Sequence, residues 1–323
     1  MAARPTIVPF AAEHLDGAAE LLAERHRRQR LVEPGLDASY EDPAAARGEI
    51  EAVRVRAGAS GAAALAGGRV EGFLLGAPLE ESWGPNVWVP AAGHAVSEAE
   101  LVRDLYASAA ERWVAEGRTS HYALVPATEV ALVDAWFRLG FGHQHVHAIR
   151  EAPSVGEVRQ TPDELVIRRA RREDIDALAR LELVLPQHQV LSPVFSRLPL
   201  PTFEEAQTEW EADFDDERFA TFVAVRDGAV IGSAVGCAIE LSSTHASLAL
   251  PRGAGFLGFA AVLPDSRGLG AGRALGEEVL SWARDAGYAH VVTDWRMTNL
   301  TSSRTWPRLG FRPTFDRLFR AVP

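Results

Sequence analysis

The chain has 323 residues and a formal net charge of -11, because 44 acidic residues outnumber 33 basic ones. This balance argues against nucleic acid as the main partner and favours cationic small molecules or amines. Every basic residue is arginine, so lysine Schiff-base chemistry is excluded. Cys237 is the only cysteine, which excludes an internal disulfide and suits a reducing compartment.

The start of the sequence lacks a basic segment followed by an apolar core, and no stretch approaches about 18 uninterrupted apolar residues. We therefore expect a cytoplasmic protein that does not enter a membrane. Hydrophobic residues make up 47% of the chain, as in folded domains. A chain of this length is expected to form two domains.

The sequence repeats itself. Residues 7–10 and the helical pattern after them resemble residues 167–170 and their following helix, at an offset of 160. Residues 136–141 (WFRLGF) resemble residues 306–311 (WPRLGF), at an offset of 170. Two related domains follow, at 1–150 and 165–323, joined by a linker at 151–164 that is rich in proline, glycine and charge.

In the second domain the patterns predict a strand, a helix, an irregular proline-rich stretch, and then further helices and strands. In chain order these are a strand at 165–169, helices at 173–183 and 202–213, strands at 219–226, 230–240 and 255–263, a helix at 270–286, a strand at 289–294, a helix at 299–308 and a strand at 311–320.

Three glycines occur in RGLGAG, residues 267–272, between a predicted strand and a predicted helix. At a helix start the first N–H groups have no partner within the helix and the dipole is positive, so a glycine loop there can bind an anion. Arg267 and Arg273 add charge. The run lacks the Lys-Ser/Thr ending of a Walker A loop, and it lies too late in its domain for a dinucleotide fingerprint.

Residues 262–272 (VLPDSRGLGAG) resemble the acyl-CoA loop of the GNAT N-acetyltransferases. Asn299, Ser302, Trp306 and residues 309–311 resemble the second signature of that family. The resemblance implies an α/β (α+β) fold of two tandem GNAT-like domains, each with a mixed, mostly antiparallel sheet that splays after its fourth strand and is flanked by helices.

The resemblance also implies that acetyl-CoA is the co-substrate. The fourth strand would bind the pantetheine arm, the glycine loop would hold the pyrophosphate, and the asparagine would approach the cofactor from the next helix. The residues implied to bind it are Ala260, Ala261, Val262, Arg267, Gly268, Leu269, Gly270, Ala271, Gly272, Arg273 and Asn299.

The first domain departs from the family pattern. Its counterpart of the loop, within residues 89–100, has no glycine pair and no arginine, and it carries Glu98 and Glu100, which would repel a phosphate. Glu129 stands at the position that corresponds to Asn299. We therefore expect a degenerate domain that keeps the fold and has lost the cofactor.

The family implies direct attack of an amine on the thioester, which requires a base because an alkylammonium must first lose a proton. The candidate bases are Glu240, Asp294, His245 and Glu182. The tyrosine that commonly serves as the acid is replaced by Trp306, which cannot release a proton in practice. The predicted acceptor pocket contains His188, Gln189, Ser192, Trp295 and Arg296.

Two further features receive structural interpretations. Cys237 lies in a predicted strand and is expected to be buried. His143, His145 and His147 alternate along a strand, where a solvated face is favoured over a metal site, and we expect no metal.

The sequence thus predicts an N-acetyltransferase that acts on the amine of a small molecule or peptide, as a monomer (a pseudo-dimer of its two domains) or as a homodimer. Two alternatives stay open. They are a non-catalytic acyl-CoA-binding or sensor protein and an interaction scaffold that binds no cofactor.

Overall fold

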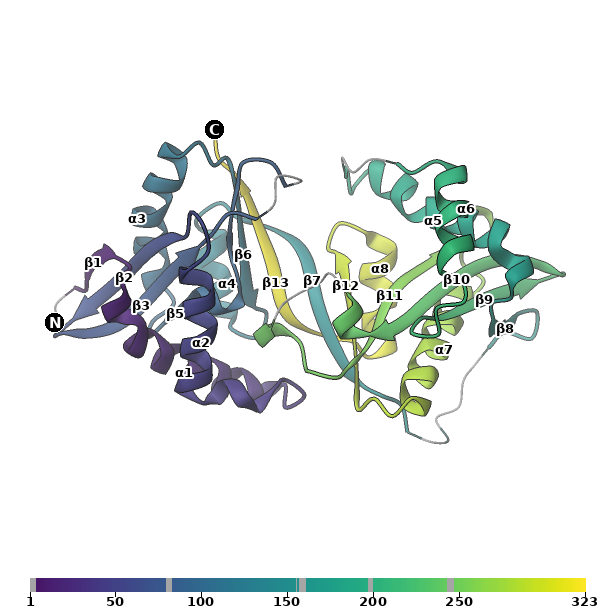
Figure 1. The fold of residues 1–323 in the computed structure, drawn as a ribbon, viewed down its shortest axis with the longest axis horizontal. Coiled ribbons are helices and arrows are strands. Elements are labelled where there is room, and N and C mark those ends of the chain that lie inside the picture. The colour runs from purple at the N-terminus through teal and green to yellow at the C-terminus, as the bar shows by residue number, and fades with distance from the viewer. Residues whose placement is uncertain (1–3, 80–82, 155, 157–160, 197–199, 243–246) are drawn as a thin grey trace. The chain divides into compact units, whose positions relative to one another are not determined.

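A computed structural model (Figure 1) describes residues 4–79, 83–154, 156, 161–196, 200–242 and 247–323. Its contacts divide the chain into two compact units. Unit 1 comprises Met1–His147, Ala246–Pro251 and Pro313–Pro323, and unit 2 comprises Ala148–His245 and Arg252–Arg312. The predicted linker lies partly outside the described residues. Within these ranges no helix is both long and apolar enough to cross a membrane.

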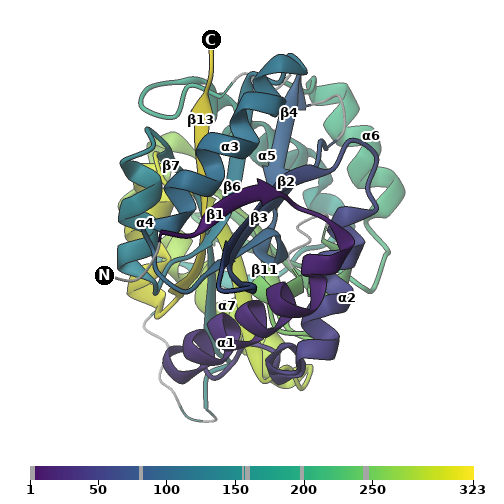
Figure 2. The same cartoon turned by 90° about the vertical axis from the view of Figure 1, so that its left-hand side faces the viewer.

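The first sheet of unit 1 is antiparallel, with the strand order β1-β2-β3-β5. Figures 1 and 2 show helix α3 on one side of this sheet and helices α1 and α2 on the other. The elements are β1 (Thr6–Pro9), α1 (Leu15–Val32), α2 (Pro43–Arg54), β2 (Ser60–Ala66), β3 (Arg69–Gly76), β5 (His94–Val96) and α3 (Leu101–Ala115).

The second sheet of unit 1 has the order β4-β6-β13-β7. Its first pair, β4 with β6, is parallel, and β13 runs antiparallel to β6. The elements are β4 (Asn86–Val89), β6 (Ser120–Pro126), α4 (Val130–Phe137), β7 (Gly142–Glu151) and β13 (Arg312–Ala321). The core of the unit contains Trp113, Trp136 and Leu318, all almost fully buried.

Unit 2 is built from a sheet with the order β12-β11-β10-β9-β8. Helices α5 and α6 cover one side and α7 covers the other (Figure 1). The elements are β8 (Val166–Arg169), α5 (Ile175–Val190), α6 (Phe203–Asp213), β9 (Ala220–Arg226), β10 (Ala229–Ala238), β11 (Gly255–Val262), α7 (Ala271–Asp285), β12 (His290–Arg296) and α8 (Leu300–Thr305).

The largest difference from the predicted elements is in α5. The sequence predicts a helix that ends at 183, because Pro186 removes a hydrogen bond from a helix and opposes its continuation. The structure instead continues the helix through Pro186 to Val190. His188 and Gln189 therefore lie in its last turn and not in an irregular stretch.

The unit 2 sheet splits between β11 and β12, as the predicted fold requires. The two strands pair in parallel only at Gly255–Val291, Phe256–Val292 and Leu257–Thr293. The Thr293 hydroxyl still donates to the Leu257 carbonyl at 2.9 Å. Beyond this point the described strands pair with β11 only through β10, as far as Val262, so among the described residues one edge of its last five residues has no strand partner.

The end of the chain belongs to unit 1. We expected the second domain to run to residue 323, but residues 313–323 lie in unit 1, where β13 pairs with β6 from Phe315 to Ala321. Conversely, residues 148–151 of β7 lie in unit 2. Each unit thus takes a strand segment from the other half of the sequence, which the repeat alone does not indicate.

Replacing Leu318 with alanine should destabilise unit 1. Leu318 is fully buried in the core of that unit, and such truncations cost about 2–5 kcal/mol. Hydrogen exchange should accelerate in β6 and α4 and stay unchanged in β9 and β10.

The matched control is Leu280→Ala, because Leu280 is equally buried on α7 of unit 2. It should accelerate exchange in unit 2 instead. Faster exchange in β9 and β10 of the Leu318 variant would contradict the assignment of β13 to unit 1.

Candidate active site

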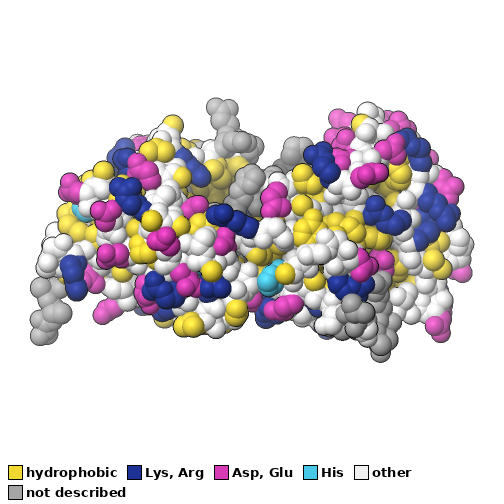
Figure 3. All heavy atoms as spheres, turned by 60° about the horizontal axis from the view of Figure 1, so that its bottom comes forward, with side chains coloured by type: hydrophobic (Ala, Val, Ile, Leu, Met, Phe, Trp, Pro, Cys, Tyr) yellow, Lys and Arg dark blue, Asp and Glu magenta, His cyan; other side chains and the backbone are white. Residues whose placement is uncertain are grey.

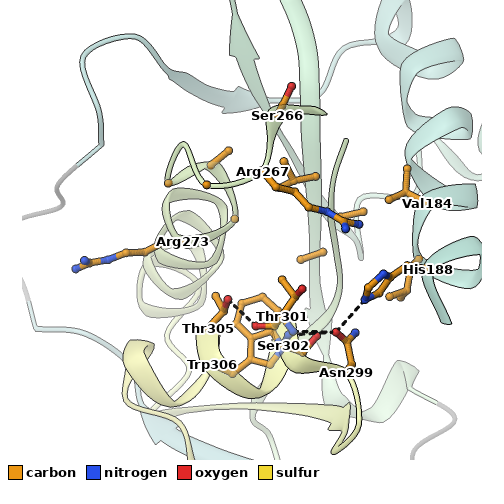
Figure 4. A pocket seen from close by; sticks show the side chains of 18 of the residues that line it. Val184, His188, Ser266, Arg267, Arg273, Asn299, Thr301, Ser302, Thr305 and Trp306 are labelled. Carbon is orange, nitrogen blue, oxygen red and sulfur yellow. Dashed lines mark hydrogen bonds between the residues drawn. The ribbon is translucent and has the colours of Figure 1, made fainter. Parts of the chain in front are cut away.

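A cavity of about 400 Å³ lies in unit 2 where the sheet splits. Its lining comes from α5, from the free part of β11, from the loop before α7 and from the start of α8 (Figure 4). The lining residues include Val184, Leu185, His188, Ala260, Ala261, Val262, Ser266, Arg267, Gly268, Gly270, Ala271, Gly272, Arg273, Asn299, Thr301, Ser302, Thr305, Trp306 and Arg308.

The loop at one end of this cavity depends on glycine. Gly268 and Gly270 have φ of +82° and +85°, a region that disfavours side chains. Gly270 is also the N-cap of α7 and supplies no side-chain acceptor, so the first N–H groups of a 15-residue helix open at the cavity. Such a helix start presents partial positive charge to an anion.

Arg267 of the loop and Arg273 in the first turn of α7 are oriented differently. In Figure 4 the Arg267 side chain extends into the space between the loop and α5. Arg273 points away, and its Nε donates to Glu277 one turn along α7 at 2.8 Å. Of the eleven residues predicted to bind the cofactor, Leu269 is the one that does not line the cavity.

Asn299 lies at the other end of the cavity and is almost fully buried. Its Oδ1 accepts from the N–H groups of Thr301 and Ser302, at 3.2 and 3.4 Å, and so caps α8. His188 Nε2 on α5 lies 3.3 Å from the same oxygen (Figure 4). Helix capping and this histidine contact are functions of Asn299 that the sequence did not predict.

Trp306 packs beneath the cavity. It is 7% exposed and meets Phe311 edge-on at 6.5 Å between ring centroids. A Cβ on Gly276 of α7 would lie 3.3 Å from Trp306 and 2.6 Å from Leu309, so glycine permits this close approach. The indole therefore serves to pack α8 against α7.

Neither predicted catalytic carboxylate lines the cavity. Glu240 is exposed and accepts from the Gly253 N–H at 2.8 Å, and Asp294 is half-buried on β12. Glu182 is also absent from the lining, although burial raises the pKa of its carboxyl. His245 lies outside the described residues. The proposed base role of Glu240 and Asp294 stays a prediction from the sequence.

The residues predicted for the acceptor pocket are only partly brought together. Arg296 Nε donates to the Gln189 side chain at 3.1 Å, linking β12 to α5, whereas Trp295 is buried. Cys237 is buried on β10, and burial raises its thiol pKa to about 11. This supports the structural role expected for it.

Unit 1 fills the equivalent split with its own side chains. In the pairing register, His94 lies opposite Leu74 on β3, as Ala260 lies opposite Ala234 on β10. His94 is fully buried, and its Nε2 lies 2.9 Å from the Leu124 carbonyl on β6. The imidazole of His94 therefore bridges β5 and β6 at the split of unit 1.

Arg25 of α1 fills the rest of this split. Its guanidinium donates to the carbonyls of Ala91, at 2.6 Å, and of His94. At an offset of 160 its counterpart is Leu185, which lines the unit 2 cavity. Arg25 is 1% exposed, and burial lowers its pKa to about 10.

The loop before the helix is also shorter in unit 1. Residues 97–100 connect β5 to α3, whereas residues 263–270 connect β11 to α7, so four positions are missing. Arg28 and Glu129 of unit 1 correspond to His188 and Asn299 of unit 2. The Arg28 guanidinium donates to the Glu129 carboxylate at 3.1 Å. Unit 1 thus differs from unit 2 both in the length of this loop and in the side chains at these two positions.

The alternating histidines of β7 do not form a metal site in the described ranges, where no group of three potential ligands occurs. His143 Nε2 lies 3.0 Å from Asp316 Oδ1.

Comparisons with known proteins support the resemblance. Residues 184–311 match the sequence profile of the Acetyltransferase (GNAT) family. The chain is similar to a GCN5-related N-acetyltransferase from Sphaerobacter thermophilus, with a TM-score of 0.59, 15% identity, and coverage of 100% of this chain and 98% of that one.

Two further structures are similar. A glucosamine N-acetyltransferase region of a fungal multi-domain enzyme gives a TM-score of 0.52 and 14% identity, covering 98% of this chain and 38% of that one. A tandem GNAT protein from the clavulanic acid biosynthesis pathway gives 0.49 and 18%, covering 99% of each chain. No curated protein matches. The similarities to the Sphaerobacter thermophilus and fungal proteins show the fold alone, and this fold is the predicted one.

The stability of the protein should fall as the pH drops below 6.5. Burial, with help from the Arg25 charge, lowers the pKa of His94 from 6.5 to about 3. The unfolded chain therefore binds a proton in this window that the folded chain does not, which costs about 1.4 kcal/mol per pH unit.

His94→Gln removes this titration and keeps a group that can donate to the Leu124 carbonyl. Urea unfolding should be measured from pH 7.5 to pH 4, and each protein's free energy of unfolding compared with its own value at pH 7.5. On this scale the free energy of unfolding should fall less steeply for the variant than for the wild-type protein. Parallel curves would show that His94 does not titrate in this way.

Proposed function

We propose that this chain, which carries a GNAT acetyltransferase domain over residues 184–311, binds acetyl-CoA in unit 2 and transfers the acetyl group to an amine of a small molecule or peptide. One observation supports this most directly. The cavity of about 400 Å³ connects the open start of α7 with the free edge of β11.

The loop end of the cavity suits a diphosphate. Backbone N–H groups at a helix start bind phosphate oxygens well, and the helix dipole adds to the attraction. A Cβ at Gly268 would meet no atom of the described residues within 4 Å, so the space beside this backbone is open to a ligand. Arg267 supplies a full charge beside them.

The β11 edge suits the amide-containing pantetheine arm. A strand edge presents N–H and C=O groups that an extended chain can pair with, and Ala260, Ala261 and Val262 present this edge to the cavity. Small side chains at the first two positions leave room beside it. When bound, the acetyl thioester supplies the acyl group that an amine attacks.

We further propose that unit 1 binds no acetyl-CoA. Arg25 already donates to the carbonyls of the parted strand, His94 bridges the split, and the loop that would hold phosphate is four residues shorter. Any ligand would first have to displace a buried guanidinium from its partners.

The proposal that the acceptor is an amine rests on the net charge of the chain and on its similarity to the GNAT family. The net charge of -11 favours a cationic amine. On the face shown in Figure 3, acidic and basic side chains are interspersed without a continuous basic stripe, which gives nucleic acid no evident binding surface there. A cytoplasmic location is part of the same proposal.

The alternative, a non-catalytic acyl-CoA sensor, is favoured by Trp306. This indole is packed against Phe311 and cannot protonate a leaving thiolate. Thiol release from acetyl-CoA over a panel of amines separates the two functions. Turnover on any amine supports the transferase, and tight binding without turnover supports the sensor.

Gly272→Glu tests the binding site. Gly272 has no positive φ, and a Cβ there would lie 3.7 Å from Val262, an ordinary contact. A carboxylate in the first turn of a helix favours the fold but repels a diphosphate. Calorimetry should show acetyl-CoA affinity reduced by about 100-fold or more, with an unchanged or higher melting temperature.

Gly48→Glu is the matched control, because Gly48 lies on α2 of unit 1 with open space around it. It adds the same charge and should leave the affinity unchanged. Undiminished affinity in the Gly272 variant would place the diphosphate elsewhere.

A further inference from the structure

Among the described residues that line the cavity, His188 is the one whose side chain ordinarily titrates near neutral pH. The other ionisable lining residues are Arg267, Arg273 and Arg308, which keep their protons. In the part of the chain that the structure describes, the lining contains no carboxylate, tyrosine or cysteine. His188 is therefore the first candidate for a base that takes a proton from an amine in this cavity.

Asn299 determines which nitrogen of His188 carries the proton. The atom of Asn299 that faces the imidazole also accepts from the N–H groups of Thr301 and Ser302, so it must be the carbonyl oxygen and not the amide nitrogen. An oxygen without a hydrogen can only accept. His188 Nε2, 3.3 Å away, must then be the donor.

A neutral imidazole with a proton on Nε2 has a lone pair on Nδ1. We propose that His188 Nδ1 is the general base of the acetyl transfer and that Asn299 is the positioning residue that fixes its tautomer and ring orientation. This inference rests on the proposed function. It has the form of a base oriented by a third group.

The location of the pair agrees with this role. In Figure 4 the loop that carries Ser266 and Arg267 lies at one end of the cavity, and His188 and Asn299 lie at the other. A ligand held at the loop by its diphosphate extends along the β11 edge toward this second end. His188 reaches it only because α5 continues to Val190.

The proton balance is simple. An alkylammonium transfers one proton to Nδ1, and the freed nitrogen forms a bond to the acyl carbon. The bond from that carbon to sulfur breaks, and its electron pair leaves on sulfur. The second proton lost by the nitrogen ends on the sulfur, and His188 returns its proton to solvent.

The charges around His188 are basic. The Arg267 side chain extends toward it from the loop (Figure 4), and Arg296 of β12 donates to the adjacent Gln189. Strand β11 carries no titratable side chain, and Glu209 of α6 acts on Glu182.

The first test uses the protein alone. Nitrogen-15 correlation spectra of the imidazoles should show His188 as the Nε2–H tautomer, and Asn299→Ser should abolish this preference. Serine still caps a helix but is too short to reach His188. An Nδ1–H tautomer in the wild-type protein would overturn the proposal.

The second test uses the amine substrate on which the wild-type protein turns over. His188→Gln should lower kcat/KM by about 100-fold or more and leave acetyl-CoA affinity within about twofold by calorimetry. Gln187→Ala, an exposed neighbour on the same helix, should change neither. Full activity of the His188 variant would overturn the assignment, whereas absence of turnover in the wild-type protein would instead contradict the proposed function.

Asn299→Asp tests the effect of Asn299 on His188 separately from its role as the cap of α8. The carboxylate keeps the helix cap and accepts from Nε2, but its charge stabilises the imidazolium. The acidic limb of the pH–rate profile should therefore move up by about one unit or more. A profile that does not move, with the variant folded and active, would show that the limb does not report His188.

Discussion

The structure depends on how a sheet satisfies its backbone where two strands part. In unit 2, β11 separates from β12 after Leu257, and the edge of its last five residues has no strand partner in the described parts of the chain. Buried backbone groups need hydrogen-bond partners. Within the described residues this edge faces a cavity instead, so the fold creates a place where an extended, amide-containing molecule can complete the sheet.

The two units resolve this constraint in opposite ways. In unit 1 the guanidinium of Arg25 and the imidazole of His94 satisfy carbonyls around the parted strands. In unit 2 their counterparts are Leu185 and Ala260, which are apolar and line the cavity. Apolar side chains at these two positions thus accompany an open cavity, and large polar side chains accompany a filled split.

The chemistry of the site follows from a helix that is longer than its sequence suggests. Continuation of α5 past Pro186 places His188 beside Asn299, and the cap of α8 fixes which atom of Asn299 faces the imidazole. The tryptophan where an acid would be expected is occupied with packing α8 onto α7. Proton transfer in this site would therefore be carried by the α5 side of the cavity.

Local periodicity, turn chemistry and backbone freedom around residues 267–272 were enough to predict the repeat and the glycine loop, and the splayed α/β fold was predicted from the resemblance of residues 262–272 and 299–311 to the GNAT family. Three features could be seen only in the folded chain: β13 completes unit 1, Arg25 and His94 fill its split, and His188 meets Asn299. Each of these joins residues 30 or more positions apart, as the separation of 69 between Arg25 and His94 illustrates, and local patterns carry no information about which distant groups satisfy one another.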